Sequence, residues 1–150
     1  KVAKILNVSQ KEAKQAVENF MQSIQGLAEL KKKIIPHIAK RGWFRGLDGR
    51  KVVVPSEHKT LAGMLQNGES TIMKHSALDW VHKARRQFIE FKLVTWPHDE
   101  WQTEVRGQMK DAELLGKIQR KSIVDTGEKF GMICPLAGST DIGYNWKDTH

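Results

Sequence analysis

The sequence lacks the features that mark secreted and membrane proteins. Its 150 residues include one cysteine, Cys134, which excludes an internal disulfide and a cysteine-based zinc cage and suits a reducing cytoplasm. No run approaches the roughly 18 consecutive apolar residues that a membrane span requires. No short apolar core follows a basic amino end either, so we expect neither a transmembrane helix nor a signal peptide.

Acidic residues are scarce in the first part of the chain. Lys and Arg number 25 against 17 Asp and Glu, a formal net charge of +8. Residues 1–92 carry a net charge of +10 and residues 93–150 a net charge of −2. A basic part followed by an acidic part favours a polyanion partner and a carboxylate site, although basic side chains can also merely solvate helix faces.

Apolar spacing and capping residues predict several helices. Ser9 and Glu12 fit a capping box, and the apolar residues that follow recur at helical spacing to Ile24. Gly42 is a suitable stop for a second helix, and Ser56 is a suitable cap for a long third one. The expected helices cover residues 10–24, 27–39, 57–86 and 111–126. Gly68 lies inside the long helix, where it indicates either close packing or a bend.

Between the helices the hydrophobic period shortens to that of strands. Residues 43–45 and 51–54 flank an Asp-Gly turn, and residues 91–96 and 101–105 flank Pro97-His98-Asp99-Glu100, so both pairs predict hairpins. Residues 132–136 predict a last strand, followed by an irregular tail. The fold class expected is α+β, with antiparallel hairpins packed on helices.

The strongest candidate site is His98-Asp99-Glu100 at a hairpin turn. Two adjacent carboxylates there can present hard oxygen ligands to Mg²⁺ without disturbing the strand ladder. Phosphoryl and nucleotidyl transfer use such a metal, with a second one about 4 Å away. Taken alone, these three residues also fit an exposed polar turn with no catalytic role.

Other chemistries find no support. The six histidines form no tight ligand cluster, and neither a Gly-x-Ser-x-Gly elbow nor a phosphate-binding Gly-x-x-x-x-Gly-Lys-Ser/Thr loop occurs. The five tryptophans can stack on bases, yet most are expected to anchor the core.

Five motifs in order resemble the C-terminal part of a family A DNA polymerase, most closely those of short-tailed bacteriophages. These motifs are Ala3-Lys4-Ile5-Leu6-Asn7-Val8-Ser9 with Glu12-Ala13, Gly46-Leu47-Asp48-Gly49-Arg50-Lys51, Leu65-Gln66 through Lys74, His98-Asp99-Glu100, and Gly143-Tyr144-Asn145-Trp146. The resemblance implies a palm portion preceded by two fingers-derived helices. Residues 1–42 would follow the fingers, and residues 43–150 would form the C-terminal palm segment.

The resemblance also implies catalytic roles. Asp99 would hold the divalent metals, with Glu100 assisting, so both are implied metal ligands. His98 would lie beside the primer terminus. The implied cofactor is Mg²⁺ in a two-metal site that another segment completes.

A second group of residues is implied to contact DNA. Gln66 would contact the minor groove at the newest base pairs, where the acceptors common to all four pairs report shape rather than sequence. Arg50, Lys51 and His58 would contact the backbone or the primer-template, and such contacts are salt-sensitive. The implied partners are primer-template DNA, deoxynucleoside triphosphates and an upstream polymerase part, in a bacterial or phage-infected cytoplasm, with no membrane.

The chain also departs from the family pattern. Ala62 replaces an Asn four residues before Gln66, and Glu69 would bring a negative charge close to the duplex. Pro97 and Trp101 replace aliphatic residues beside the acidic turn. The motif that supplies the other metal-binding aspartate, the nucleotide-binding fingers helix and an exonuclease carboxylate set are not present.

These observations predict one function and leave alternatives open. The expected function is the C-terminal part of a DNA-directed DNA polymerase, a split enzyme or a fragment of a longer chain, inactive without its N-terminal part. One alternative is a catalytically inactive remnant that binds duplex DNA, and another is a basic helical protein with accidental motifs.

Overall fold

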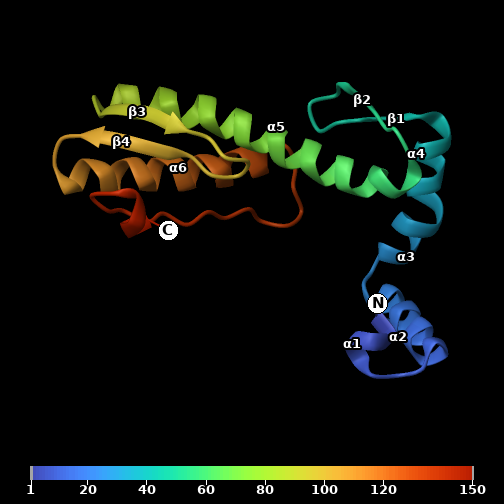
Figure 1. Ribbon diagram of the computed structural model, residues 1–150. Helices are drawn as coiled ribbons and strands as arrows, with labels where there is room; N and C mark the ends of the chain where they lie inside the picture. Colours follow the sequence, from blue (N-terminus) through green and yellow to red (C-terminus); the bar gives the residue numbers. More distant parts are fainter. Residues whose placement is uncertain (1, 150) are drawn as a thin grey trace. The chain divides into compact units, whose positions relative to one another are not determined.

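The computed structural model describes residues 2–149, which form helices and two antiparallel two-stranded sheets (Figure 1). The predicted α+β class is confirmed. The elements are α1 (Val2–Leu6), α2 (Gln10–Ser23), α3 (Leu27–Glu29), the π-helix η1 (Leu30–Ile34), α4 (Ile35–Arg41), β1 (Trp43–Arg45), β2 (Lys51–Val53), α5 (Glu57–Arg86), β3 (Glu90–Thr95), β4 (Gln102–Arg106), α6 (Met109–Lys129) and the 3₁₀ turn η2 (Trp146–Thr149). Within residues 2–149, no helix combines the length and apolarity needed to cross a membrane.

The chain forms two compact units. Unit 1 comprises residues 1–45 and 51–64, and unit 2 comprises residues 46–50 and 65–150. The division into a segment 1–42 that follows the fingers and a palm segment 43–150 stays a prediction. Each unit has its own small core.

Helix α2 of unit 1 begins where its sequence predicts. The Ser9 Oγ accepts a hydrogen bond from the Glu12 amide at 3.3 Å, and the Glu12 carboxylate accepts one from the Ser9 amide at 2.9 Å. This capping box satisfies amides at the helix start. The Ser9 hydroxyl donates to the Glu12 carboxylate at 2.7 Å, and this bond, followed by that from the Ser9 amide, holds the pKa of Glu12 below its usual value. Gly26, with φ of +80°, separates α2 from the next helical stretch.

The predicted second helix is present but is not regular throughout. It continues from α3 through the π-helix η1 into α4 and ends at Gly42, where φ is +78° and the Gly42 amide donates to the Ile38 carbonyl oxygen. Glycine is suited to this left-handed position because it has no Cβ. The three consecutive lysines Lys31, Lys32 and Lys33 lie in the π-helical part and are exposed.

The first hairpin covers the small core of unit 1. Phe44 pairs with Val52 in the antiparallel register of β1 and β2, and its side chain is buried. The core consists of Ile38, Phe44 and Val54, with Val52 and Met64 packed against it. Ser56 does precede α5, as predicted, but its hydroxyl makes no hydrogen bond with the described residues, so the predicted side-chain cap is wrong.

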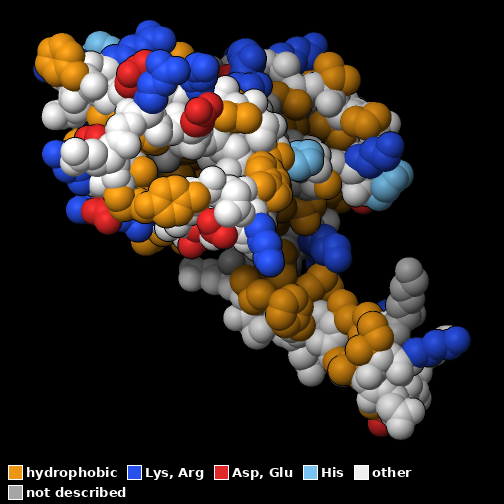
Figure 2. Space-filling view, turned by 60° about the vertical axis from the view of Figure 1, so that its left-hand side comes forward, with side chains coloured by type: hydrophobic (Ala, Val, Ile, Leu, Met, Phe, Trp, Pro, Cys, Tyr) orange, Lys and Arg blue, Asp and Glu red, His pale blue; other side chains and the backbone are white. Residues whose placement is uncertain are grey.

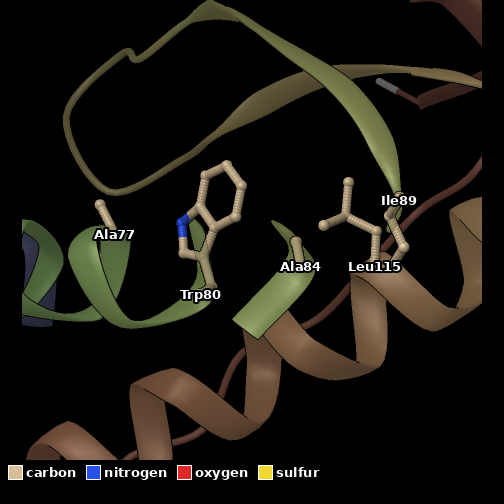
Figure 3. Packing of buried hydrophobic residues seen from close by; sticks show 5 residues of the cluster. All are labelled: Ala77, Trp80, Ala84, Ile89 and Leu115. Atoms are coloured by element: carbon tan, nitrogen blue, oxygen red, sulfur yellow. The ribbon is translucent and has the colours of Figure 1, made fainter. Parts of the chain in front are cut away.

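The core of unit 2 is centred on the indole of Trp80, which lies between α5, α6 and the β3–β4 hairpin. Trp80 on α5 is completely buried, and Leu115 on α6 is 1% exposed (Figure 3). The cluster contains Ala77, Trp80, Ala84, Ile89 and Leu115. The β3–β4 hairpin lies along α5 (Figure 1). It contributes Phe91, Trp101 and Val105 to the cluster. The hairpin is thereby fixed on the carboxyl-terminal half of α5.

Ion pairs join α5 to α6 beside this core. Lys83 Nζ lies 2.6 Å from the Asp79 carboxylate and 2.8 Å from that of Asp125, which also pairs with Lys121 at 2.7 Å. The hydrogen bond from Lys121, followed by that from Lys83, holds the pKa of Asp125 below its usual value. The network therefore depends on the charged form of Asp125.

The turn of the first hairpin packs on the long helix, but the packing at Gly68 leaves room for a methyl group, so the close packing predicted there does not require a glycine. The Leu47 side chain, from the turn of the first hairpin, lies 3.8 Å from the position that a Cβ on Gly68 would occupy. In the same turn, a Cβ on Gly46 would overlap the Asn67 side-chain oxygen. Both contacts lie within unit 2, and they fix the turn at residues 46–50 against α5.

The predicted strand at residues 132–136 is wrong. This segment is irregular, Ile133 is fully exposed, and the described sheets contain only β1–β2 and β3–β4. Gly131 turns the chain with φ of +65°, and Leu136 then packs on Gly127 of α6. Further along, Thr140 lies against Gly116 of the same helix. The tail is therefore held by a helix surface rather than by a strand edge.

Candidate catalytic turn and nucleic-acid contacts

The acidic turn, which contains His98, Asp99 and Glu100, connects β3 to β4. Strands β3 and β4 are antiparallel, with an irregular register between Leu93 and Thr95. The Glu100 amide donates to the Pro97 carbonyl oxygen at 3.0 Å, which closes the turn. His98 has a φ of +51°, a left-handed conformation that is uncommon outside glycine. The predicted hairpin and turn are confirmed.

Aromatic side chains hold this turn in place. The Trp96 indole N–H donates to the His98 carbonyl oxygen at 3.1 Å. The Trp96 ring packs edge-on against Trp101, with centroids 6.0 Å apart, and Trp101 packs against buried Trp80 at 5.7 Å. Trp101 therefore joins the turn to the core of unit 2. The expectation that most tryptophans anchor the core is confirmed for these three, whereas Trp146 is 56% exposed.

The two carboxylates differ in their surroundings. Asp99 is exposed, and among residues 2–149 its carboxylate has no hydrogen-bond or ion-pair partner. Glu100 is half-buried, and one of its carboxylate oxygens accepts a hydrogen bond from the Gln102 side chain. Asp99 is thus free to bind a cation, while Glu100 is held by its neighbour on β4.

Carboxylate oxygens are the donors that Mg²⁺ prefers, so the donor chemistry of Asp99 and Glu100 fits this ion. Within the described part of the chain, however, no group of three or more His, Cys, Asp or Glu side chains converges as metal ligands. The turn can supply one side of a metal site. Further oxygens would have to come from water, substrate or another polypeptide segment.

The implied minor-groove residue lies on the long helix. Gln66 is exposed on α5, and so is Glu69 one turn further along. His58 is exposed in the first turn of α5, and Ala62 is exposed between it and Gln66. Positions 58, 62 and 66 recur every four residues, the spacing of one helix face. All of these side chains are accessible to a ligand.

The two implied backbone contacts at the first hairpin are not equivalent. Arg50 is exposed, but its Nε donates to the Asp48 carboxylate at 2.5 Å, and its amide donates to the same carboxylate at 3.2 Å. Burial tends to raise the pKa of Asp48, but the hydrogen bonds and charge of Arg50 outweigh this and lower it. Arg50 thereby helps to close the turn. Lys51 is exposed and has its ammonium 5.1 Å from the Trp43 ring centroid.

Sequence reasoning did not find the residues that support these sites. Trp96 fixes the acidic turn through its indole N–H, and Arg41 lies over the same Trp43 ring as Lys51. The sequence signals for these contacts were weak: an aromatic residue lies two positions before His98, and a basic residue, Arg41, lies two positions before Trp43. Such patterns do not specify contacts, because the side-chain directions depend on the backbone.

The fold of the chain is that of part of a polymerase domain. A solved structure, the POL domain of Pol1 from M. smegmatis in complex with DNA primer-template and dNTP, matches 83% of this chain with a TM-score of 0.69. The match covers 24% of that chain at 17% sequence identity. At this identity the similarity concerns the fold.

Sequence comparison leads to phage enzymes. Over its full length, the chain is 26% identical to the DNA-directed DNA polymerase of Enterobacteria phage T3 and 25% identical to that of Escherichia phage T7. It is 30% identical, over 75% of its length, to the DNA-directed DNA polymerase of Escherichia phage Phieco32. The chain spans 24%, 24% and 19% of these relatives. No protein-family model matches it. The predicted resemblance to phage DNA polymerases is confirmed.

Proposed function

We propose that this chain is the C-terminal, palm-containing part of a family A DNA-directed DNA polymerase that acts once the remaining polymerase segments assemble with it. The observation that carries the proposal is the exposed Asp99 carboxylate, which has no partner among residues 2–149 and lies at an acidic turn closed by Trp96 in a polymerase-like fold. The similarity to phage polymerases over the whole chain gives independent support.

The proposed reaction is template-directed nucleotidyl transfer. The primer 3′-oxygen bonds to the α-phosphorus of a deoxynucleoside triphosphate, the bond to the pyrophosphate breaks, and the hydroxyl proton is released. Asp99 and Glu100 would hold Mg²⁺, which when bound lowers the pKa of the 3′-hydroxyl and neutralises phosphate charge. His98 would lie beside the primer terminus, and Gln66 and His58 would contact the duplex.

An exposed apolar surface supports the need for a further polypeptide segment. On α1 and α2, the side chains of Ile5, Leu6 and Phe20 are 78%, 52% and 60% exposed. Figure 2 shows hydrophobic side chains gathered over this part of unit 1. Apolar patches of this kind mark interaction surfaces. The chain also spans only a quarter of the T3 and T7 relatives, so most of a complete polymerase would lie in other segments.

Primer extension with Mg²⁺ and four deoxynucleotides tests the proposal. The chain is assayed alone and mixed with a polypeptide that carries the upstream polymerase segments. We expect extension only in the mixture, and Asp99→Ala should reduce its rate about a thousandfold, since loss of a metal ligand costs about 4 kcal/mol of transition-state stabilisation. Glu104→Ala, which removes another exposed carboxylate from the same hairpin, is the matched control and should retain activity.

Two outcomes would overturn parts of the proposal. If Asp99→Ala retained more than about a tenth of the extension rate, Asp99 would have no place in the mechanism. If an assembled mixture showed no extension, the DNA-binding remnant would be the better description. That second candidate rests on Ala62 and on the exposed carboxylate of Glu69 beside Gln66, and it predicts salt-dependent DNA binding that Asp99→Ala leaves intact.

A further inference from the structure

Two cations are gathered on one indole at the junction of α4 and the first hairpin. Arg41 ends α4, and its guanidinium carbon lies 4.1 Å from the centroid of the Trp43 ring. Lys51 begins β2, and its ammonium nitrogen lies 5.1 Å from the same centroid. Both distances are within the range of a cation–π interaction. All three residues belong to unit 1.

These contacts order two long side chains before any ligand arrives. The Arg41 Nε also donates to the Trp43 carbonyl oxygen at 2.9 Å, so its guanidinium is fixed by a ring and by a backbone acceptor. A guanidinium has five N–H donors, and this bond uses one of them. The other donors project from an exposed residue. Fixing the side chain in advance lowers the entropic cost of binding.

The positive charge at this place is not compensated by acidic side chains. Among the described residues, neither Arg41 nor Lys51 forms an ion pair with Asp or Glu. The hairpin register places Arg45 directly opposite Lys51. The neighbouring acid, Asp48, is already paired with Arg50. Arg41 and Lys51 therefore have no acidic partner among the described residues and are open to a bound anion.

We propose that Arg41 and Lys51, both held on Trp43, form a binding site for the phosphodiester backbone of primer-template DNA. The planar guanidinium can donate two parallel hydrogen bonds to one phosphate, and the ammonium can neutralise a second phosphate as a point charge. Trp43 is half-buried and carries two cations, so it supports them rather than stacking on a base. The proposal rests on the proposed function for the choice of DNA as the polyanion. Lys51 is already an implied DNA contact, and the proposal adds Arg41 as a second phosphate-binding residue and Trp43 as the ring that supports both.

The salt dependence of DNA binding tests this site with the full chain. Fluorescence anisotropy measures binding to a labelled primer-template at several NaCl concentrations. Each phosphate contact contributes about 0.9 to the slope of log affinity against log salt, so Arg41→Gln with Lys51→Gln should lower the slope by about 1.8. The control, Lys31→Gln with Lys33→Gln, removes the same charge from exposed positions of η1 and should change the slope far less.

Trp43 variants test the support separately from the charge. Trp43→Leu keeps both cations and should weaken binding severalfold, whereas Trp43→Phe keeps an aromatic ring and should restore most of the affinity. Circular dichroism and the unfolding midpoint confirm that each variant is folded. Free inorganic phosphate serves as a competitor, and competition at concentrations comparable to those of DNA phosphate would indicate a general anion site and overturn the assignment to DNA.

The outcomes separate this site from the proposed catalytic function. If the Arg41 and Lys51 double variant bound DNA with an unchanged slope, or if the Lys31 and Lys33 control lost as much, the site would be disproved even where extension by the mixture succeeded. Loss confined to the Arg41 and Lys51 variant would support the site, even where an assembled mixture failed to extend primers. No DNA binding by the chain or by the mixture would overturn both.

Discussion

The Trp96 indole N–H donates to the His98 carbonyl oxygen at 3.1 Å, across the single residue Pro97. This hydrogen bond closes the end of β3 and accompanies the left-handed conformation of His98. Asp99 follows directly, so the direction of its carboxylate depends on this closure. Trp101 has a similar place in the aromatic cluster, but its indole nitrogen is buried with no hydrogen-bond partner among the described residues.

The two tryptophans therefore offer a matched comparison. Trp96→Phe removes a hydrogen bond and leaves the His98 carbonyl without that donor, while Trp101→Phe removes an N–H that forms none. Both changes shorten an indole to a phenyl ring in the same cluster. We expect Trp96→Phe to lower the free energy of unfolding by about 1 kcal/mol more than Trp101→Phe does, as measured by urea denaturation. Equal losses would mean that the hydrogen bond does not stabilise the turn.

Stability should depend on pH through Asp125. Hydrogen bonds from Lys121 and Lys83 lower its pKa in the folded state, so its contribution is present above the unfolded pKa of about 3.9 and is lost as pH falls through the folded value. Near neutral pH, Asp125→Asn should reduce the free energy of unfolding by up to about 1 kcal/mol.

Denaturation at several pH values checks this expectation. The difference between wild type and Asp125→Asn should shrink below about pH 4. Asp141→Asn provides the control, because Asp141 is exposed and forms no ion pair among residues 2–149. A difference that stayed constant down to about pH 2 would show that the charge of Asp125 is not what stabilises the α5–α6 contact.

Two helical glycines should respond to alanine in opposite ways. A Cβ on Gly63 of α5 would meet nothing within 4 Å, so Gly63→Ala should stabilise the protein by about 0.4–1 kcal/mol. A Cβ on Gly116 of α6 would lie 2.5 Å from the Thr140 methyl carbon, so Gly116→Ala should destabilise it by about 1 kcal/mol or more and loosen the tail.

Thermal unfolding and limited proteolysis of residues 132–149 measure these two effects. Thr140→Ser removes the overlapping methyl group, so combining it with Gly116→Ala should recover part of the loss. If Gly116→Ala were neutral and the tail remained resistant to protease, the contact between the tail and α6 would contribute nothing to stability.

The parts of the fold that were predicted are those that local interactions dictate. The Ser9–Glu12 capping box, the left-handed stop at Gly42 and the Asp-Gly hairpin each involve residues within a few positions of one another. Because their hydrogen bonds form within the segment itself, residue type and spacing were sufficient to predict them. The acidic turn at Asp99 belongs to the same group.

The sequence by itself determined the main helices, the hairpins and the exposed carboxylate of Asp99, because each depends on short-range backbone geometry. Tertiary structure decided what holds them. Residues 132–136 have strand-like composition, yet a strand requires a partner edge, and the glycines of α6 offered a packing surface instead. Two further sets of contacts likewise depend on tertiary structure: the packing of Trp96 on Trp101, and the cation–π contacts of Arg41 and Lys51 with Trp43. The side-chain directions that these contacts require are fixed only when separate segments pack together.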